Sequence, residues 1–192
     1  MRCLGSDADG VADLLDDFVS GMREGGLSVT LKTFPGIGNV SADVTESIAE
    51  NTDSLMTIRD TNFVPYASGI QAGADCVMVS NAAYSKLTVK KVPAFMSQDI
   101  VTKLLREELG FDGIVMTSPL NDNVIENNYT NEFAVVEAVK AGCDLIVLPG
   151  NFKECYEALI TAVEEGRIDE KVINTSVRRI LQNKIQRGIL VL

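Results

Sequence analysis

The sequence predicts an α/β fold built on a parallel sheet, and two observations support this prediction. Segments with helical periodicity alternate with short apolar runs along the chain. A short motif, a Gly, one further residue and an Asp, also precedes three of these runs, at Gly73–Asp75, Gly110–Asp112 and Gly142–Asp144. A Gly at this place can end a helix in the left-handed conformation, and such apolar runs are typical of strands buried on both faces. Strands joined by helices in this way run parallel, with right-handed crossovers.

Four apolar runs are expected to be strands, and five segments are expected to be helices. The second helix begins with Ser97 as its N-cap. The polar segment 36–62 has no strong period, so we expect a loop that is functional or disordered. The expected strands are 28–34, 76–80, 113–117 and 145–149, and the expected helices are 8–24, 97–109, 131–141, 152–165 and 169–187.

Four expected strands are too few to close a (βα)8 barrel. A closed (βα)8 barrel has eight strands and typically about 250 residues. This chain has 192 residues and four expected strands. An open parallel sheet must cover both faces and protect both edges. The chain is therefore either doubly wound, or it completes its sheet with strands from a partner.

Composition excludes several classes of function. The net charge of −10 makes nucleic acid and anionic membranes poor partners, so neither is expected. The chain contains no histidine, so its own residues cannot form a Ser–His–Asp triad, a Cys–His dyad or an HExxH zinc site. The sequence has no cofactor fingerprint, and neither a metal nor a cofactor is expected.

The cysteines are expected to be buried, inert thiols. None of them forms a CxxC pair, and two of them open apolar runs. Residues 1–10 contain no apolar signal core, and no apolar run is long enough to span a bilayer. We therefore expect a reducing, cytoplasmic setting. The cysteines are Cys3, Cys76, Cys143 and Cys155.

Three stretches resemble one known family. Arg2–Asp7 reads RCLGSD, Lys32–Thr45 reads KTFPGIGNVSADVT, and Pro93–Leu120 contains LLREELGFDG. These are similar to the motifs R-x-F-G-S-D, K-H-F-P-G-H-G-D-T-x-x-D-S-H and L-L-R-x-x-L-G-F-D-G-V-x-x-T-D-D-L of glycoside hydrolase family 3, in particular its bacterial β-N-acetylhexosaminidase branch. The resemblance implies a partial (βα)8 TIM-like barrel of about four parallel βα units. We expect one domain over 1–192, the C-terminal part of that barrel, with a doubly wound open sheet as the alternative.

The family's catalytic groups are replaced in this sequence. The resemblance implies a retaining mechanism with an Asp nucleophile and a His acid/base that is held by a second Asp. Ser118 stands at the nucleophile position, Thr45 stands at the His position, and Asp43 retains the second Asp. A serine without an activating base is a poor nucleophile, so no catalytic residue is expected. Three further family histidines correspond to Thr33, Ile37 and Asn81.

Two matches to substrate-binding positions remain, at Lys32 and Arg2. The sequence thus predicts an inactive family 3 homologue that acts as a structural or interaction module, or as a weak binder of an amino sugar or glucoside. Asp122 is expected to be a solvated loop carboxylate. A homodimer, or pairing with a complementary barrel fragment, is expected for the open sheet.

Two alternative functions stay open. One is an active glycosidase that cleaves O-glycosyl bonds of N-acetylglucosaminides or β-glucosides. Such an enzyme would have to recruit Asp43, Glu46 or Glu50. The other alternative is an enzyme of a different class on the same fold.

Overall fold

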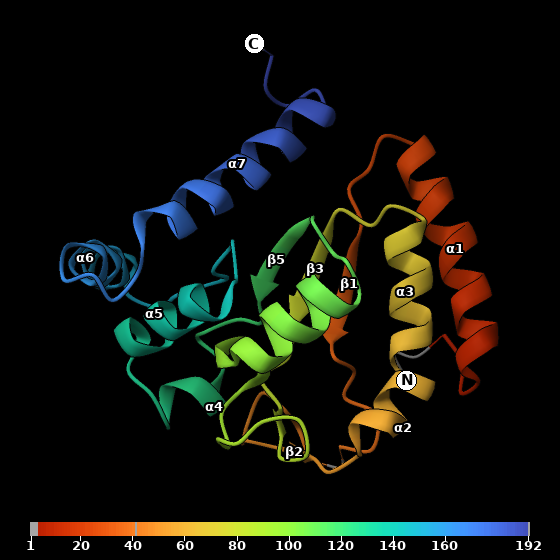
Figure 1. Ribbon diagram of the computed structural model, residues 1–192, viewed down its shortest axis with the longest axis horizontal. Coiled ribbons are helices and arrows are strands. Elements are labelled where there is room, and N and C mark those ends of the chain that lie inside the picture. Colours follow the sequence, from red (N-terminus) through yellow and green to blue (C-terminus); the bar gives the residue numbers. More distant parts are fainter. Residues whose placement is uncertain (1–3, 41, 192) are drawn as a thin grey trace.

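A three-stranded parallel sheet forms the centre of the fold (Figure 1). Its strands are β1 (Thr30–Phe34), β3 (Cys76–Val79) and β5 (Ile114–Thr117), and they lie in the order β1–β3–β5. The fourth expected strand, 145–149, joins this sheet through a single parallel bridge from Leu145 to the middle of β5. The prediction of parallel strands is therefore confirmed, but the fourth strand is only a bridge.

The protein is described by a computed structural model that covers residues 4–40 and 42–191, so Arg2 and Cys3 lie outside the described residues. All five expected helices are present, with ends shifted by a few residues. The segment 36–62 was expected to be a loop, and this is wrong in part because it contains a short strand and a helix. The remaining elements are α1 (Ala8–Glu24), β2 (Glu50–Asn51), α2 (Leu55–Asp60), α3 (Phe63–Gln71), β4 (Ala83–Tyr84), the 3-10 turn η1 (Ala94–Met96), the π-helical η2 (Asp99–Glu108), α4 (Asn123–Glu126), α5 (Asn131–Ala141), α6 (Phe152–Glu164) and α7 (Glu170–Gln186).

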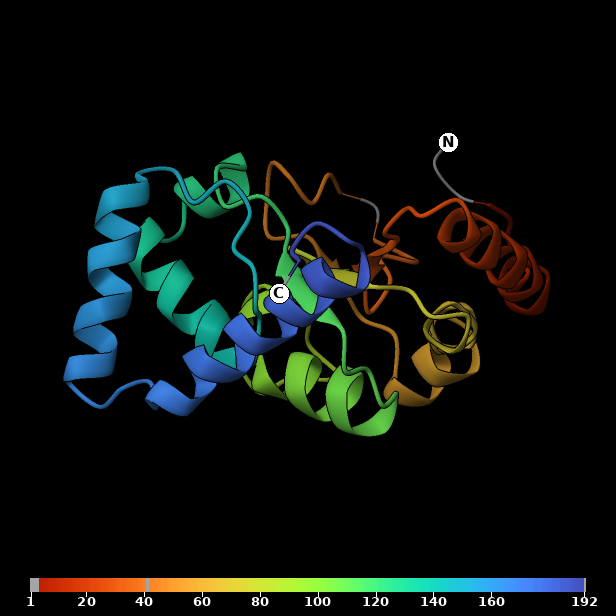
Figure 2. The ribbon, with the colours of Figure 1, turned by 90° about the horizontal axis from the view of Figure 1, so that it is seen from above.

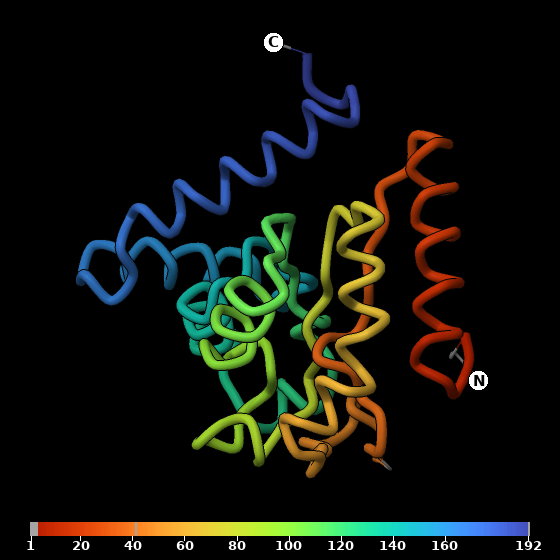
Figure 3. The backbone as a smooth tube through the Cα atoms, turned by 45° about the vertical axis from the view of Figure 1, so that its right-hand side comes forward, coloured from red at the N-terminus to blue at the C-terminus, as the bar shows by residue number. Residues whose placement is uncertain are grey.

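Helix pairs lie beside both edge strands of the sheet. α1 packs against α3 next to β1, and α5 packs against α6 next to β5, as Figures 1 and 3 show. Gly69 of α3 lies directly on Leu31, because a Cβ added to Gly69 would lie 2.8 Å from the Leu31 Cδ1. No described helix is both long enough and apolar enough to cross a bilayer.

The two faces of the sheet differ in how well they are covered. The register aligns Leu31 with Val77 and Val115, and these three side chains are buried in the core beneath the helices. The next row aligns Lys32 with Met78 and Met116 on the opposite face. Lys32 is exposed and the two methionines are only half-buried. In a closed barrel this second row would fill the interior, so here the interior face is partly open.

The Asp of the first motif anchors α7 to the start of the sheet. The Asp75 carboxylate accepts the Val29 backbone N–H at 2.9 Å, which joins it to the segment that enters β1. Asn183 and Arg187 of α7 and its C-terminal end donate to the same carboxylate, with Nδ2 and Nε each 3.1 Å from Oδ1. Arg23 at the end of α1 completes the set at 3.0 Å. One buried acceptor thus joins two helices and a strand.

Asp144 anchors α7 to β5, the strand at the other edge of the sheet, in the same way. Its carboxylate accepts the Val115 N–H of β5 at 2.9 Å and the Ser176 hydroxyl of α7 at 2.7 Å. Arg106 of η2 and Arg179 of α7 form ion pairs with it at 2.5 and 3.2 Å. Through these two aspartates α7 lies across the amino-terminal ends of the strands (Figure 2). Asp112 of the second motif is exposed instead.

Replacing Asp75 by Asn should lower the free energy of unfolding at neutral pH by about 3 kcal/mol, because Arg187 would lose its buried counter-ion. Burial opposes ionisation of Asp75, but the hydrogen bonds from Arg187 and Val29 and the charges of Arg187 and Arg23 outweigh it and lower the pKa of this carboxyl. Because the folded-state pKa is lowered, this contribution is present above the ordinary Asp pKa of about 4 and is lost as the pH falls below it.

Urea titrations of Asp75→Asn and of the exposed control Asp112→Asn, at neutral pH and near pH 3, measure this difference. The control should stay within about 0.5 kcal/mol of the parent chain. An equal loss in the two variants at neutral pH would refute the anchoring role of Asp75.

Candidate functional site

The described candidate residues gather at the carboxyl-terminal end of the sheet, opposite α7. Lys32 lies in β1, Asp43 and Thr45 lie in the segment that follows β1, and Ser118 directly follows β5. Figure 1 shows this end of the sheet near β2 and α4. The carboxyl-terminal ends of strands are where barrel folds place their sites. Arg2 lies outside the described residues.

Ser118 is engaged with the backbone and is not poised as a nucleophile. Its side chain is buried, and its hydroxyl donates to the Val79 carbonyl oxygen at 2.8 Å. The Ser118 backbone N–H donates to the same oxygen at 3.0 Å. A backbone carbonyl cannot accept the proton of an attacking hydroxyl, so this contact holds β5 beside β3 without activating the serine.

Thr45, at the position where the resemblance implies a histidine, makes a short local contact with Asp43. Its hydroxyl donates to Asp43 Oδ1 at 2.7 Å, and its backbone N–H donates to the same oxygen at 2.9 Å. The Asp43 position therefore still holds residue 45, but a hydroxyl does not titrate near neutral pH as a histidine does. The Thr45 carbonyl also accepts the Val124 N–H at 2.8 Å, which fixes this segment against α4.

Asp122 was expected to be solvated, and this is wrong because its side chain is half-buried and hydrogen-bonded. Asn81, which follows β3, donates from Nδ2 to Asp122 Oδ2 at 2.9 Å. Burial raises the pKa of the Asp122 carboxyl, and the charges of Asp43 and Glu46 raise it further. The Asn81 hydrogen bond and the Lys32 charge oppose this shift without cancelling it.

Asn81 itself has an unused acceptor. The residue is 1% exposed, and its Oδ1 is buried without a hydrogen-bond partner among the described residues. A buried polar atom left unpaired costs about 1–3 kcal/mol. At the level of sequence, Asn81 matches only a position where the resemblance implies a histidine. The signal that could have found its role is that a polar residue shortly after one parallel strand lies beside the segment that follows the next strand.

Three carboxylates and one lysine thus surround this end of the sheet. We call Asp43, Glu46 and Asp122 the acidic cluster. The charges of Asp43, Glu46 and Lys32 all act on Asp122. Asn123 Nδ2 donates to Glu46 Oε2 at 2.8 Å, which is a second link between the segments after β1 and β5. No group of His, Cys, Asp and Glu side chains in the described ranges is placed to hold a metal ion.

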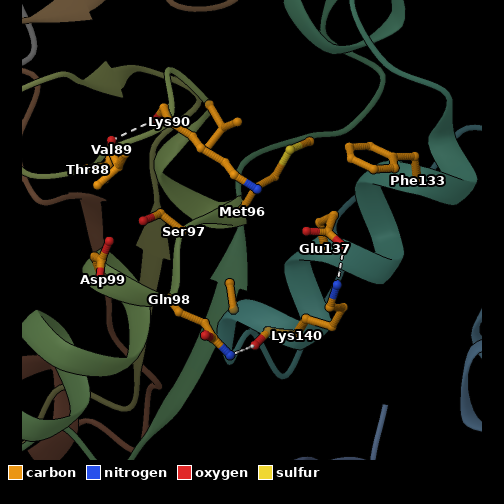
Figure 4. Close-up of a pocket in the computed structure, with 12 residues that line it drawn as sticks. Thr88, Val89, Lys90, Met96, Ser97, Gln98, Asp99, Phe133, Glu137 and Lys140 are labelled. Carbon is orange, nitrogen blue, oxygen red and sulfur yellow. Dashed lines mark hydrogen bonds and ion pairs between the residues drawn. The ribbon is translucent and has the colours of Figure 1, made fainter. Parts of the chain in front are cut away.

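A surface cavity of about 390 Å³ lies away from these residues (Figure 4). It is bounded by the segment 88–99 and by α5. Three of its charged side chains already have partners, since Lys140 pairs with Glu137 at 2.6 Å and Asp99 pairs with Lys103 at 2.7 Å. It contains none of the residues that the sequence singled out for the site.

Replacing Asp122 by Asn should raise the stability of the chain slightly at neutral pH, by about 0.5 kcal/mol after solvent screening. The folded-state pKa of Asp122 is raised, so its proton favours folding and ionisation disfavours it. This destabilisation is absent below the ordinary Asp pKa and develops as the pH rises through the raised value.

Thermal melts of Asp122→Asn and of the control Asp112→Asn, at about pH 3.5 and at pH 7, test this expectation. The gain in melting temperature for Asp122→Asn should appear only at pH 7, and the control should show no gain at either pH. A lower melting temperature for Asp122→Asn at neutral pH would contradict the raised pKa.

Comparison with known proteins places this site in a family. The model of the glycosyl hydrolase family 3 N terminal domain matches residues 1–183. A β-hexosaminidase from Stenotrophomonas maltophilia (strain K279a) is 32% identical over 189 residues, which cover 98% of this chain and 53% of that protein. A β-hexosaminidase from Xylella fastidiosa (strain M23) is 32% identical over 147 residues, which cover 77% of this chain and 43% of that protein.

The solved structures agree with this match. A family 3 β-N-acetylglucosaminidase from Paenibacillus sp. str. FPU-7 superposes with a TM-score of 0.94 and 33% identity, over 100% of this chain and 38% of that one. The chain therefore spans about half, or less, of the length of these relatives. It belongs to glycoside hydrolase family 3, and its sheet is part of the TIM-like barrel of that family's N-terminal domain.

Proposed function

We propose that this chain does not hydrolyse glycosides and acts as a weak sugar-binding module. The observation that most supports this is the Ser118 hydroxyl, which donates to the Val79 carbonyl at the position where the family resemblance expects a nucleophilic carboxylate. A retaining glycosidase needs a carboxylate that attacks the anomeric carbon and a second group that protonates the leaving oxygen. The hydroxyl pair of Ser118 and Thr45 supplies neither at neutral pH.

Lys32 is the residue that supports binding. It is exposed on β1 and forms no hydrogen bond or ion pair with another residue in the described ranges. Its ammonium is therefore free to donate to a sugar hydroxyl. Two of the relatives named above are β-hexosaminidases, and the third is a β-N-acetylglucosaminidase. We therefore propose an amino sugar or glucoside as the ligand class.

A second candidate function is hydrolysis by recruited carboxylates. The observation in its favour is Asp122, whose pKa is raised by burial and by the charges of Asp43 and Glu46. Two carboxyl groups with separated pKa values are what glycoside hydrolysis uses as acid and base. The interior face beside them is partly open, however, so this arrangement lacks the enclosed site that would orient a sugar.

The purified chain should turn over aryl N-acetylglucosaminides and aryl glucosides no faster than a buffer blank, since neither a nucleophile nor an acid/base is in place. The double variant Ser118→Asp, Thr45→His should also be inactive. It restores the two catalytic groups that the family resemblance implies, but the interior face of the sheet stays partly open. A release assay for the aryl alcohol measures both. A rate that co-purifies with the protein and is abolished in Asp122→Asn would instead establish the second function.

We also propose that two copies of the chain pair through their open sheets. β1 pairs only with β3 among the described strands, so its other edge offers free N–H and C=O groups. A two-fold axis would place this edge beside residues 145–149 of the second copy and would cover the half-buried Met78 and Met116 of each copy. A stable interface of this apolar kind buries more than about 2,000 Å².

Light scattering at micromolar concentration should therefore give twice the chain mass of 20.7 kDa. Met116→Lys places a charge on the interior face and should give the single-chain mass, whereas Val89→Lys, at a fully exposed side chain, should not change the mass. A parent chain that scatters as 20.7 kDa at every concentration would overturn this pairing.

A further inference from the structure

We propose that the surface cavity between the segment 88–99 and α5 binds a short, neutral oligosaccharide, at a site separate from the carboxyl-terminal end of the sheet. This goes beyond the sugar binding proposed above, because none of the residues used there lines this cavity. The cavity volume of about 390 Å³ lies within the range of small-molecule sites, about 300–1,000 Å³.

One wall of the cavity is an aromatic ring in a fixed orientation. Phe133 of α5 is 50% exposed, and its ring extends from the helix toward Met96 (Figure 4). The Tyr129 ring lies nearly parallel to it, with 6.0 Å between the ring centroids and 7° between the planes. A sugar ring has C–H bonds on its faces, and these are attracted to the electron-rich face of an aromatic ring. Phe133 thus offers a platform on which a sugar ring can stack.

A mostly buried hydroxyl is available at the other end of the cavity. Ser97 lines the cavity and is 6% exposed. Its carbonyl oxygen accepts the N–H groups of Ile100 and Val101 at the start of η2, but its hydroxyl makes no hydrogen bond with a described residue. In Figure 4 the hydroxyl points toward the side of the cavity that Thr88 and Asp99 line. The hydroxyl that was expected to cap this helix is therefore available to a ligand.

The charges around the cavity balance, which favours a neutral ligand. The lining contains two lysines, Lys90 and Lys140, and two acids, Asp99 and Glu137. Glu137 pairs with Lys140, and Asp99 pairs with Lys103. An ion of either sign would thus meet groups of its own charge at close range, whereas a neutral molecule would not.

The available hydrogen-bonding groups include both donors and acceptors. The Lys90 side chain extends toward Met96 in Figure 4, and its ammonium makes no hydrogen bond or ion pair with a described residue. Gln98 donates from Nε2 to the Lys140 carbonyl at 2.9 Å, which leaves its Oε1 as an acceptor. The Ser97 hydroxyl can donate and accept. Sugar hydroxyls also do both, so they suit this set better than an apolar molecule does.

A second hollow extends the site along α5. Its volume is about 350 Å³, and it shares Phe133, Glu137 and Lys140 with the first cavity. The rest of its lining includes Val136 of α5 and Ala158 of α6. The two cavities therefore adjoin, with the Phe133 ring between them. A single sugar ring occupies one of them, so the site fits a chain of at least two sugar units.

The test titrates the full chain with glucose, cellobiose and cyclohexanol while backbone amide shifts are followed by NMR. Both sugars should shift the amides of residues 97–99 and of α5. Cellobiose should bind about fivefold more tightly than glucose, because it reaches both cavities. Cyclohexanol has a six-membered ring with one hydroxyl, and it should bind about tenfold more weakly than glucose. Equal affinities for cyclohexanol and glucose would overturn the inference.

Two matched variants test the aromatic platform. Phe133→Ala and the control Phe152→Ala each remove a ring from a helix surface, but Phe152, which is 72% exposed on α6, lines neither cavity. Phe133→Ala should lose about fivefold in cellobiose affinity, as expected for one stacked ring, and the control should lose nothing. Equal losses in the two variants would overturn the inference.

Ser97→Ala separates a ligand contact from a structural role. It should lose about threefold in cellobiose affinity and keep the melting temperature of the parent chain, because the hydroxyl has no described partner to lose. A lower melting temperature with an unchanged affinity would assign the hydroxyl to η2 and would overturn its place in the site.

The positions of the shifts distinguish this site from the one at the strand ends. Shifts confined to the surroundings of Lys32, Thr45 and Ser118 would overturn this inference and leave the sugar binding proposed above in place. Shifts confined to residues 97–99 and α5 would support the cavity and overturn the binding at Lys32. An absence of shifts with both sugars would overturn both.

Discussion

Two buried carboxylates hold this fold together. Asp75 and Asp144 each accept a backbone N–H at the start of a strand and also pair with arginines from the helices around them. Because both reach α7, that helix is fixed across one end of the sheet, and the strand spacing at that end is set by ionic contacts as well as by packing. A buried charge of this kind is stable only while its partners stay in place.

The end opposite α7 carries the candidate site and is held more weakly. The contacts at that end are short hydrogen bonds such as Thr45 to Asp43 and Ser118 to Val79. They keep the loops ordered without a charged network. In barrel folds the amino-terminal end of the strands serves stability and the carboxyl-terminal end serves chemistry. Substitutions at Ser118 and Thr45 therefore leave the Asp75 and Asp144 anchors untouched.

The sequence predicted most of the fold because the repeated Gly and Asp mark each helix end and strand start. It did not predict α2, because six residues are too few for a clear period, although Ser54 caps that helix by accepting the Thr57 N–H at 3.0 Å. The segment 145–149 was expected to be a full strand but forms only a single bridge. Leu148 has a positive φ of 45°, which interrupts an extended chain. Of the site, Lys32, Asp43, Thr45 and Ser118 could be placed from motifs. The roles of Asp122 and Asn81 could not, since they depend on which loops meet across the sheet.

The anchoring of α7 has a consequence for how the chain is made. Asn183 and Arg187 bind Asp75 across 108 and 112 residues of sequence. On the ribosome, Asp75 is synthesised 108 residues before Asn183, so until α7 is made its ion-pair partner among the described residues is Arg23 of α1. Contacts of such long sequence separation close slowly, and domains generally fold as units once their last element is available. The amino-terminal end of the sheet is therefore completed only when α7 has emerged from the exit tunnel.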